Sequence, residues 1–516
     1  MRQRSSLVFF LVLVLFLPLC GACSGASLSI PIMRPEYNIT ESTFPDFFAS
    51  LQKSNPAVDV SGMLYPGPAL PVRPASGLIS LEEALDDVRF FFEALEHGYS
   101  GYRFFGGKEV FDNARTLIEI ELAGYAYPMQ SEWLPYFITK RLGFINDGHF
   151  SIEDYRLLPE SASFLDETCE FIRLGDRYLL KGNYLYGFVK AINDRPPEEF
   201  LRMSLSEDGR LVYRLALKSN LEAMSCTADG SGYRCSITFL LRKQPLEVVL
   251  ARQVPELFPK TAYASTWLAG ISTITCRTLM AQTLPDYHLE QFASSGATLR
   301  QEPALILDLR GNSGGSDGYA FAFFKNWTGH NVSLPGLIAN RSTPSTFRLQ
   351  ENLVAERYSE REGRNYLSWF ENPLERIQAE PEWSLDWYGG TETAAGNSNP
   401  VAGSGQLFVL TDDGVASAAE TTVGLSRMIQ GSLVLGLPTA GVHTFGNLGL
   451  LRLPHSRATV WLATTWFHIF GSGGEGLGFE PDIWLPGKGM EDRLARFIER
   501  YGLDRIRKAV KLADNY

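Results

Sequence analysis

A serine in a short turn is the first candidate for chemistry in this sequence. Residues 406–411 (Gln-Leu-Phe-Val-Leu-Thr) predict a buried strand, residues 414–420 (Gly-Val-Ala-Ser-Ala-Ala-Glu) a tight turn, and residues 421–429 a helix. This order puts Ser417 near a helix N-terminus, where unpaired backbone N–H groups favour a developing oxyanion. Ser417 is therefore a candidate nucleophile, although an isolated serine in such a turn is more often a helix N-cap or a small packing residue.

Three further segments contain residues suited to the same chemistry. His149 ends an Asn-Asp-Gly-His turn, and Glu475 lies in a Gly-rich segment at 471–476. Another Gly-rich segment, 310–315 (Arg-Gly-Asn-Ser-Gly-Gly), follows the strand-like residues 304–309 and predicts backbone N–H groups that can face an anion. It lacks the spacing of a nucleotide-binding loop. Taken singly, His149 could be a surface histidine and Glu475 a solvated acid.

Together these segments resemble one family of serine peptidases, which includes the tail-specific (C-terminal-processing) proteases and tricorn protease. The retinoid-binding repeats of the eye share its fold. The resemblance covers roughly 80–150 and 262–486, and it rests on the order and spacing of four pieces, at 142–150, 305–315, 410–420 and 475–483. It implies an α/β core of the crotonase-like (ClpP-like) type, with the Ser417 turn and the 311–315 loop side by side at strand C-terminal ends.

The family has two catalytic styles, and the sequence distinguishes them. Tail-specific members use a Ser–Lys dyad, whose lysine would fall near Val442, but no lysine occurs between Lys325 and Lys488. Tricorn-type members use a histidine and a glutamate at the positions of His149 and Glu475. Tricorn has a serine before that histidine, where this chain has Gly148, so one supporting hydrogen bond is in doubt.

The resemblance therefore implies Ser417 as nucleophile, His149 as general base and Glu475 in support. A serine hydroxyl needs a base to take its proton, and a neutral imidazole can take it and return it to the leaving amine. The backbone N–H groups of Gly314 and Ala418 would bind the oxyanion. His443, beside the position of the family lysine, is the competing candidate for the base. No metal-ligand set and no cofactor motif is apparent.

The sequence predicts five regions. They are a signal peptide of lipoprotein type at 1–23, a tether and irregular lead-in at 24–78, an N-terminal helical subdomain at 79–155, a β-rich module at 156–260, and the α/β peptidase core at 261–516 with a cap insertion at about 330–400. Residues 186–203 look like the strand, turn and helix of a PDZ module, which binds peptide at a sheet edge. A β insertion with only structural duties is the alternative.

The signal peptide predicts export and sets the expectations for the cysteines. Residues 19–23 (Leu-Cys-Gly-Ala-Cys) resemble a bacterial lipobox, which makes Cys23 a lipidation candidate; plain cleavage and secretion is the alternative. Export permits disulfides, and Cys226 and Cys235 flank a polar, Gly-rich hairpin tip, so we expect a bridge between them. We expect a cell-envelope protein, anchored to the membrane by lipid and located in the periplasm or at the cell surface.

The amino-acid composition limits the classes of partner that the protein can bind. The 516 residues are 45% hydrophobic and 20% charged, and the net charge of −11 comes without a basic block. This argues against nucleic acid and against an anionic membrane surface as the main partner, and the oligomeric state stays open. The leading hypothesis is an exported serine peptidase acting on a peptide or protein. The alternative is a catalytically silent member that binds a peptide, lipid or glycan in the same cleft.

Overall fold

The computed structural model describes residues 77–515 apart from 222, 224, 255, 260–262, 281–285, 335, 358–382, 388–404 and 470. The predicted signal peptide, the lipidation candidate Cys23 and nearly all of the predicted tether lie outside the described residues. So does most of the predicted cap insertion. Among the described residues, no helix is both long enough and apolar enough to cross a bilayer.

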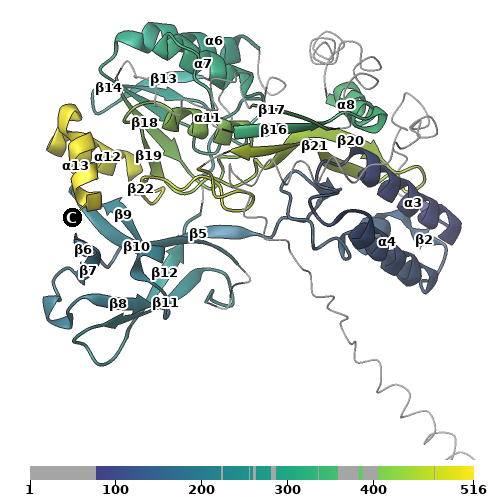
Figure 1. Ribbon diagram of the computed structural model, residues 1–516, viewed down its shortest axis with the longest axis horizontal. Helices are drawn as coiled ribbons and strands as arrows, with labels where there is room; N and C mark the ends of the chain where they lie inside the picture. The colour runs from purple at the N-terminus through teal and green to yellow at the C-terminus, as the bar shows by residue number, and fades with distance from the viewer. Residues whose placement is uncertain are drawn as a thin grey trace, which may run out of the picture. The chain divides into compact units, whose positions relative to one another are not determined.

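A parallel sheet forms the centre of the α/β part (Figure 1). Its strands are β14 (Ile271–Thr275), β15 (Ala304–Asp308), β18 (Gln406–Thr411), β19 (Leu433–Gly436) and β22 (Ile483–Trp484), in that spatial order, with β13 (Ala264–Leu268) antiparallel at the edge. The predicted strands at 304–309 and 406–411 are confirmed. Every residue of β15 and β18 is buried, as expected for parallel strands covered on both faces.

Alternate residues of these strands enter two different cores. Leu305, Leu307 and Val409 pack with the helices α6 (Asp286–Thr298), α7 (Gly318–Thr328) and α11 (Ala418–Arg427). Figure 1 shows α6 and α7 side by side. They approach so closely at Gly296 of α6 that a Cβ there would lie 2.5 Å from the carbonyl oxygen of Phe323. Ile306 and Phe408 enter the other core, with helix α12 (Met490–Tyr501).

The β-rich module contains strands and no α-helix among its described residues. Its strands are β5 (Ser161–Leu165), β6 (Phe171–Leu174), β7 (Arg177–Leu180), β8 (Val189–Ile192), β9 (Leu201–Leu205), β10 (Leu211–Asn220), β11 (Gly232–Phe239) and β12 (Leu246–Arg252). The prediction of a helix within 186–203, at 197–203, is wrong. Residues 197–199 form one 3₁₀ turn, and β9 follows because it pairs antiparallel with β10 and, at Ser204–Trp484, parallel with β22. The module and the core thus share one sheet.

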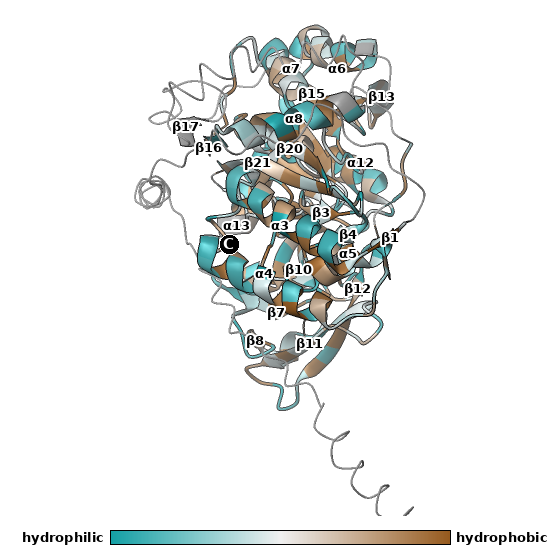
Figure 2. Ribbon diagram, turned by 90° about the vertical axis from the view of Figure 1, so that its right-hand side faces the viewer, coloured by the Kyte–Doolittle hydropathy of each residue, from teal (hydrophilic) through white to brown (hydrophobic). Residues whose placement is uncertain are grey.

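The predicted N-terminal helices are present as α3 (Leu81–Gly98), α4 (Gly107–Ala123) and the short α5 (Leu134–Thr139). A capping box begins α3, as the Ser-Leu-Glu-Glu sequence at 80–83 predicts: Ser80 N–H donates to Glu83 (2.7 Å), and Glu83 N–H donates to Ser80 Oγ (3.2 Å). Figure 2 shows hydrophilic and hydrophobic residues alternating along α3 and α4. Their apolar residues pack against β20 (Phe445–Arg452) and β21 (Thr459–Ile469).

A second sheet connects these helices to the core. Its strands run in the order β17 (Trp383–Trp387), β16 (Gly336–Arg341), β21, β3 (Ser151–Ile152) and β4 (Tyr155–Arg156), with β20 also paired to β21. Helix α8 (Pro344–Arg357) packs on β20. Because β3 begins two residues after His149, its pairing with β21 fixes the histidine loop to the α/β part.

Two local expectations need correction. The amphipathic pattern of residues 490–513 predicts one helix, but the structure divides this segment into α12 and α13 (Leu503–Asn515) at Gly502, whose φ of +68° is left-handed. The predicted Cys226–Cys235 bridge is not formed, and both thiols are free. The register explains this, since Tyr233 rather than Cys235 lies opposite Cys226.

Candidate active site

Ser417 occupies a strained turn at the carboxyl end of β18. Its φ of +55° and ψ of −126° are rare for a residue with a side chain, and such strain is often found at functional positions. Asp412 stabilises the approach to the turn, because its Oδ1 accepts hydrogen bonds from Gly311 N–H (2.8 Å) and Gly414 N–H (3.0 Å). Ser417 N–H donates to the carbonyl of Val442 (3.0 Å).

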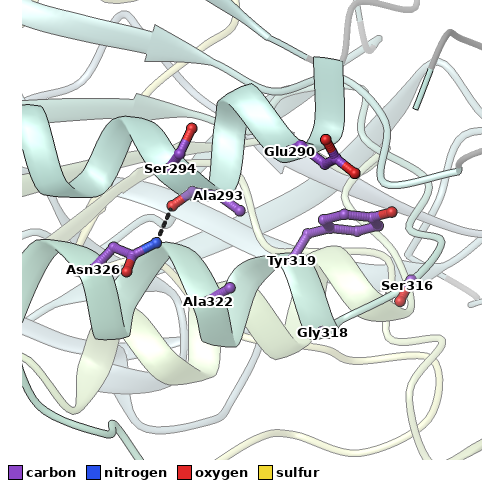
Figure 3. Close-up of a pocket in the computed structure, with 8 residues that line it drawn as sticks. All are labelled: Glu290, Ala293, Ser294, Ser316, Gly318, Tyr319, Ala322 and Asn326. Atoms are coloured by element: carbon purple, nitrogen blue, oxygen red, sulfur yellow. Dashed lines mark hydrogen bonds between the residues drawn. The ribbon is translucent and has the colours of Figure 1, made fainter. Parts of the chain in front are cut away.

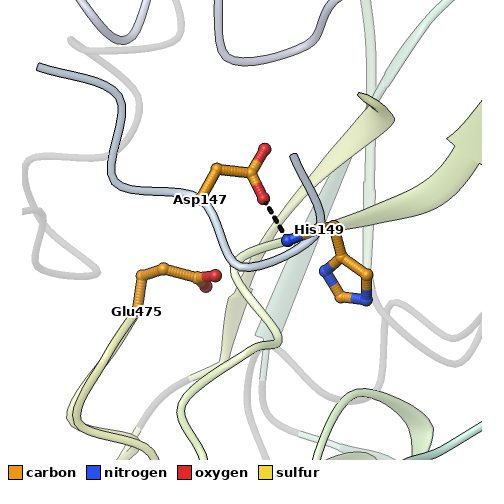
Figure 4. A group of neighbouring side chains, drawn as sticks. All are labelled: Asp147, His149 and Glu475. Carbon is orange, nitrogen blue, oxygen red and sulfur yellow. Dashed lines mark hydrogen bonds between the residues drawn. The ribbon is translucent and has the colours of Figure 1, made fainter. Parts of the chain in front are cut away.

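His149 reaches Ser417 although 268 residues separate them in the chain. The distance from His149 Nε2 to Ser417 Oγ is 3.2 Å. The histidine backbone is held by Asp147, whose Oδ1 accepts the His149 N–H (2.7 Å; Figure 4), while Oδ2 accepts the Tyr99 hydroxyl hydrogen (2.8 Å). The structure therefore brings together two of the residues that the sequence singled out.

The surroundings of His149 favour the neutral imidazole. Burial lowers the pKa of His149 from 6.5 to about 4, and the charge of Glu420 offsets only part of this effect. Its buried Nδ1 makes no hydrogen bond within the described part of the chain. A neutral ring can accept a proton from the serine hydroxyl, which is the state that a general base requires.

Glu475 lies beside the loop that contains His149, but its carboxylate binds backbone N–H groups and not the imidazole ring. Oε1 accepts the Gly148 N–H (2.8 Å) and Oε2 accepts the Thr444 N–H (2.9 Å). Asp147, His149 and Glu475 each place one polar atom within 4.8 Å of the others. Because the carboxylate oxygens are already occupied by N–H and O–H donors, this cluster has the character of a hydrogen-bonded network rather than of a metal cage.

The two carboxyl groups of this cluster influence one another. Burial raises the pKa of both Asp147 and Glu475, and the charge of Glu475 raises the pKa of Asp147 further. Two carboxyls in such a site favour holding one proton between them. Sequence reasoning assigned no role to Asp147 or Tyr99, although Asp147 belongs to the Asp-Gly-His turn that it singled out.

The Gly-rich loop lies beside the turn that contains Ser417, as predicted. A Cβ at Gly314, whose φ is +97°, would lie 2.8 Å from the Cβ of Ser417 and 3.0 Å from the backbone nitrogen of Ala418, so only glycine fits here. The Gly314 N–H was expected to face an oxyanion, but it donates to Asn312 Oδ1 (2.9 Å). Ala418 supplies the first N–H of helix α11.

The contacts of His443 are with groups other than the Ser417 hydroxyl. Its Nε2 contacts the hydroxyl of Ser472, and its Nδ1 lies 3.4 Å from Oε1 of Glu420. Glu420 is fully buried and accepts hydrogen bonds from the backbone N–H groups of Ser417 (3.1 Å) and Val442 (2.7 Å). The sequence analysis missed Glu420, although its place three residues after Ser417 is the spacing of a capping box.

Lys218 is a second residue that sequence reasoning missed. It lies on β10 of the β-rich module, and its Nζ donates to the carbonyls of Thr439 (2.6 Å) and Ala440 (2.8 Å). Burial lowers the pKa of Lys218, and the charge of Asp413 opposes this effect. The module thus contributes a cation to the turn that precedes His443, which no local sequence pattern indicates.

A hollow between α6 and α7 is separate from these residues (Figure 3). Its lining includes Glu290 and Ser294 of α6 and Tyr319 of α7. The amide of Asn326 at its edge donates to the Ala293 carbonyl (2.8 Å). Neither Ser417 nor His149 lines it, so the hollow is not part of the candidate site.

Comparison with known proteins gives one family match. Residues 283–485 match the model of peptidase family S41, a range that includes Gly314, Ser417, Ala418, His443 and Glu475. His149 lies outside the matched range. No curated protein matches the chain.

Several solved structures are similar at low identity. Mature CPAF is 14% identical with a TM-score of 0.44, covering 84% of this chain and 98% of that one. The photosystem II D1 C-terminal processing protease is 13% identical with a TM-score of 0.35, covering 79% and 94%. Tricorn protease is 13% identical with a TM-score of 0.32, covering 84% and 37%. Scores this low support no conclusion about the present chain.

Proposed function

We propose that the chain is a hydrolase of the serine-peptidase type that cleaves peptide bonds through Ser417, His149 and Glu475. The match of residues 283–485 to the model of peptidase family S41 supports this proposal. The observation that carries this proposal is the 3.2 Å contact between His149 Nε2 and Ser417 Oγ. That distance is within the reach of direct proton transfer between a hydroxyl and an imidazole.

The proposed reaction proceeds in two stages. Ser417 Oγ attacks the carbonyl carbon of the scissile bond while His149 Nε2 takes the hydroxyl proton, and His149 then gives that proton to the leaving amine. Water, deprotonated by the same imidazole, releases the acyl group and restores the serine. Glu475 supports this cycle through the Gly148 N–H, which fixes the backbone next to His149.

We propose Ala418 N–H as the first oxyanion donor, because the start of α11 leaves it without a partner inside the helix. Gly314 can become the second donor only if its N–H leaves Asn312 Oδ1. Such an exchange would occur when a negatively charged oxygen is present, since an oxyanion is a stronger acceptor than a neutral amide oxygen.

The finer features of the fold and location also belong to this proposal. The core is crotonase-like, and the β-rich module is a PDZ-like unit that binds peptide along β8, a strand at the end of its sheet. Residues 1–23 direct export, and lipid on Cys23 anchors the protein in the cell envelope. Mass spectrometry of the mature N-terminus tests this, because an acylated Cys23 is expected and a free one would contradict the anchor.

Hydrolysis of an unfolded protein by purified wild type and Ser417→Ala tests the activity. Wild type should produce new peptides and Ser417→Ala should not, while Ser432→Ala, a change at another serine outside the site, should leave the rate unchanged. A folded wild type that cleaves nothing would favour the alternative of a silent protein that binds peptide, lipid or glycan in the same cleft.

A further inference from the structure

His443 lies between two elements that the proposed function requires. Its side chain is buried, with the residue 6% exposed, and its ring stacks on Phe479 with centroids 5.5 Å apart. On one side, Nδ1 faces Glu420 at 3.4 Å, which is the distance of an ion pair rather than of a short hydrogen bond. Glu420 in turn accepts the Ser417 N–H (3.1 Å), so it belongs to the nucleophile turn.

On its other side, His443 faces the loop that contains Glu475. Its Nε2 contacts Ser472 Oγ, which also accepts the Gly474 N–H (2.9 Å). Glu475 follows directly, and its carboxylate holds Gly148 next to His149. A continuous series of contacts therefore joins the Ser417 turn to the loop that contains His149. Glu420, His443 and the Ser472 loop lie between them.

The same contacts could suggest a second Ser–His–Glu nucleophile, but the Glu420 carboxylate, 3.4 Å from Nδ1, favours a charged His443 ring. Burial, the largest single effect, lowers the pKa of His443, but the carboxylates of Glu420 and Glu475 together outweigh it, and the pKa is raised overall. An imidazolium has no free lone pair, so it donates to Ser472 Oγ and cannot take the proton of that hydroxyl. Beside a charged ring, Ser472 is an acceptor and not an activated nucleophile.

We propose that His443 is a positioning residue, an imidazolium that joins Glu420 under the nucleophile turn to Ser472 in the Glu475 loop. The inference rests on the proposed function, since it concerns the same site. A buried carboxylate without a counter-charge is costly, and His443 supplies that charge where Glu420 lies. Removing it should let the two loops separate while the fold persists.

Deprotonation of His443 should have the same effect as removing the side chain. The charged or titratable groups that face it are Glu420 on α11, Glu475 in its loop, Lys218 on β10, and two other histidines, His149 and His468. The two carboxylates favour the charged ring, whereas Lys218 disfavours it. Activity should therefore fall on the alkaline side as His443 loses its proton.

Steady-state kinetics of His443→Gln tests the role, because glutamine keeps the approximate size and one donor but not the charge. We expect kcat to fall by about tenfold to a hundredfold with KM little changed, as for a small misplacement of catalytic groups. Ser472→Ala should also lower kcat, and Ser472→Thr should restore it. His455→Gln is the matched control, since His455 faces two acids, Glu83 and Asp86, on α3.

The pH profile separates positioning from a general structural role. The alkaline limb that belongs to His443 should be absent in His443→Gln and present in Ser472→Thr. Independently of activity, the ¹⁵N signals of the His443 ring should show both nitrogens protonated at about pH 7. A neutral ring there, or full activity with an unchanged pH profile in folded His443→Gln, would overturn the inference. Wild type without any hydrolysis would instead contradict the proposed function, while the ring signals would still decide the charge.

Discussion

At the scale of single residues, the proposed chemistry depends on a neutral His149. Burial holds its pKa at about 4, below the usual 6.5, so the neutral base persists well into the acid range. The acid limb of kcat/KM should therefore have its midpoint below 6.5, because the rate falls only when the pH drops through the folded pKa. Measuring kcat/KM of peptide hydrolysis against pH checks this.

The acid limb of that profile must be separated from acid unfolding, because the protein also loses stability at low pH. An unfolded chain protonates His149 near 6.5 while the native protein resists it, so the free energy of unfolding decreases as the pH is lowered below that value. Circular dichroism at each pH separates lost folding from lost catalysis. An acid limb at or above 6.5 in folded protein would contradict the neutral-base assignment.

Glu475 should contribute less to the rate than Ser417 or His149. Its two oxygens accept the N–H groups of Gly148 and Thr444, whereas a glutamine at this position keeps only one acceptor. We expect Glu475→Gln to lose part of kcat, and Ser417→Ala to lose nearly all of it. Peptide hydrolysis by the two folded variants checks this order, and equal losses would show that Glu475 takes part in the chemistry directly.

At the scale of elements, strong local patterns predicted the strands that lead into the candidate site. The buried runs before Gly311 and Ser417 predict strands β15 and β18, and the Ser80 capping box predicts the start of α3; all three are confirmed. These patterns involve only residues that are close together in the chain, so the sequence alone is enough to predict them. Adjacent parallel strands then explain why the two turns meet.

Long-range pairing explains what the sequence could not give. Residues 201–205 have no local feature that excludes a helix, and they form a strand because β10 and β22 supply partners. The contacts of Glu420 with His443, and of Lys218 with Thr439, likewise join segments whose proximity only the fold creates. The contact of His443 with Ser472 could not be predicted for the same reason.

The strand register also predicts free thiols. Cys226 lies opposite Tyr233, and burial raises the pKa of the Cys235 thiol to about 12, so both groups should be unpaired and slow to react in the native protein. Alkylation after denaturation without reductant should modify both cysteines. A peptide pair linked by a Cys226–Cys235 disulfide would show that the hairpin adopts another register.

At the scale of the whole described chain, the β-rich module and the α/β core should unfold together. Phe497 of α12 is fully buried in a core that contains residues of both, such as Leu201 and Leu433. Phe497→Ala should lower the free energy of unfolding by about 3–5 kcal/mol and shift one common transition in calorimetry. Leu512→Ala, at a side chain 43% exposed on α13, is the control and should change stability little. Two transitions, of which only one shifts, would contradict this coupling.

The most direct test of the central assignment is covalent labelling of the nucleophile. A fluorophosphonate reacts with a serine only when a base activates it, so wild type should be labelled and mass spectrometry should locate the adduct on Ser417. Folded His149→Ala should label at least about a hundredfold more slowly, and the double variant Ser417→Ala/His149→Ala should lose no more activity than either single variant, since the two act as one unit. Labelling of another serine, or undiminished labelling of Ser417 in folded His149→Ala, would contradict the account.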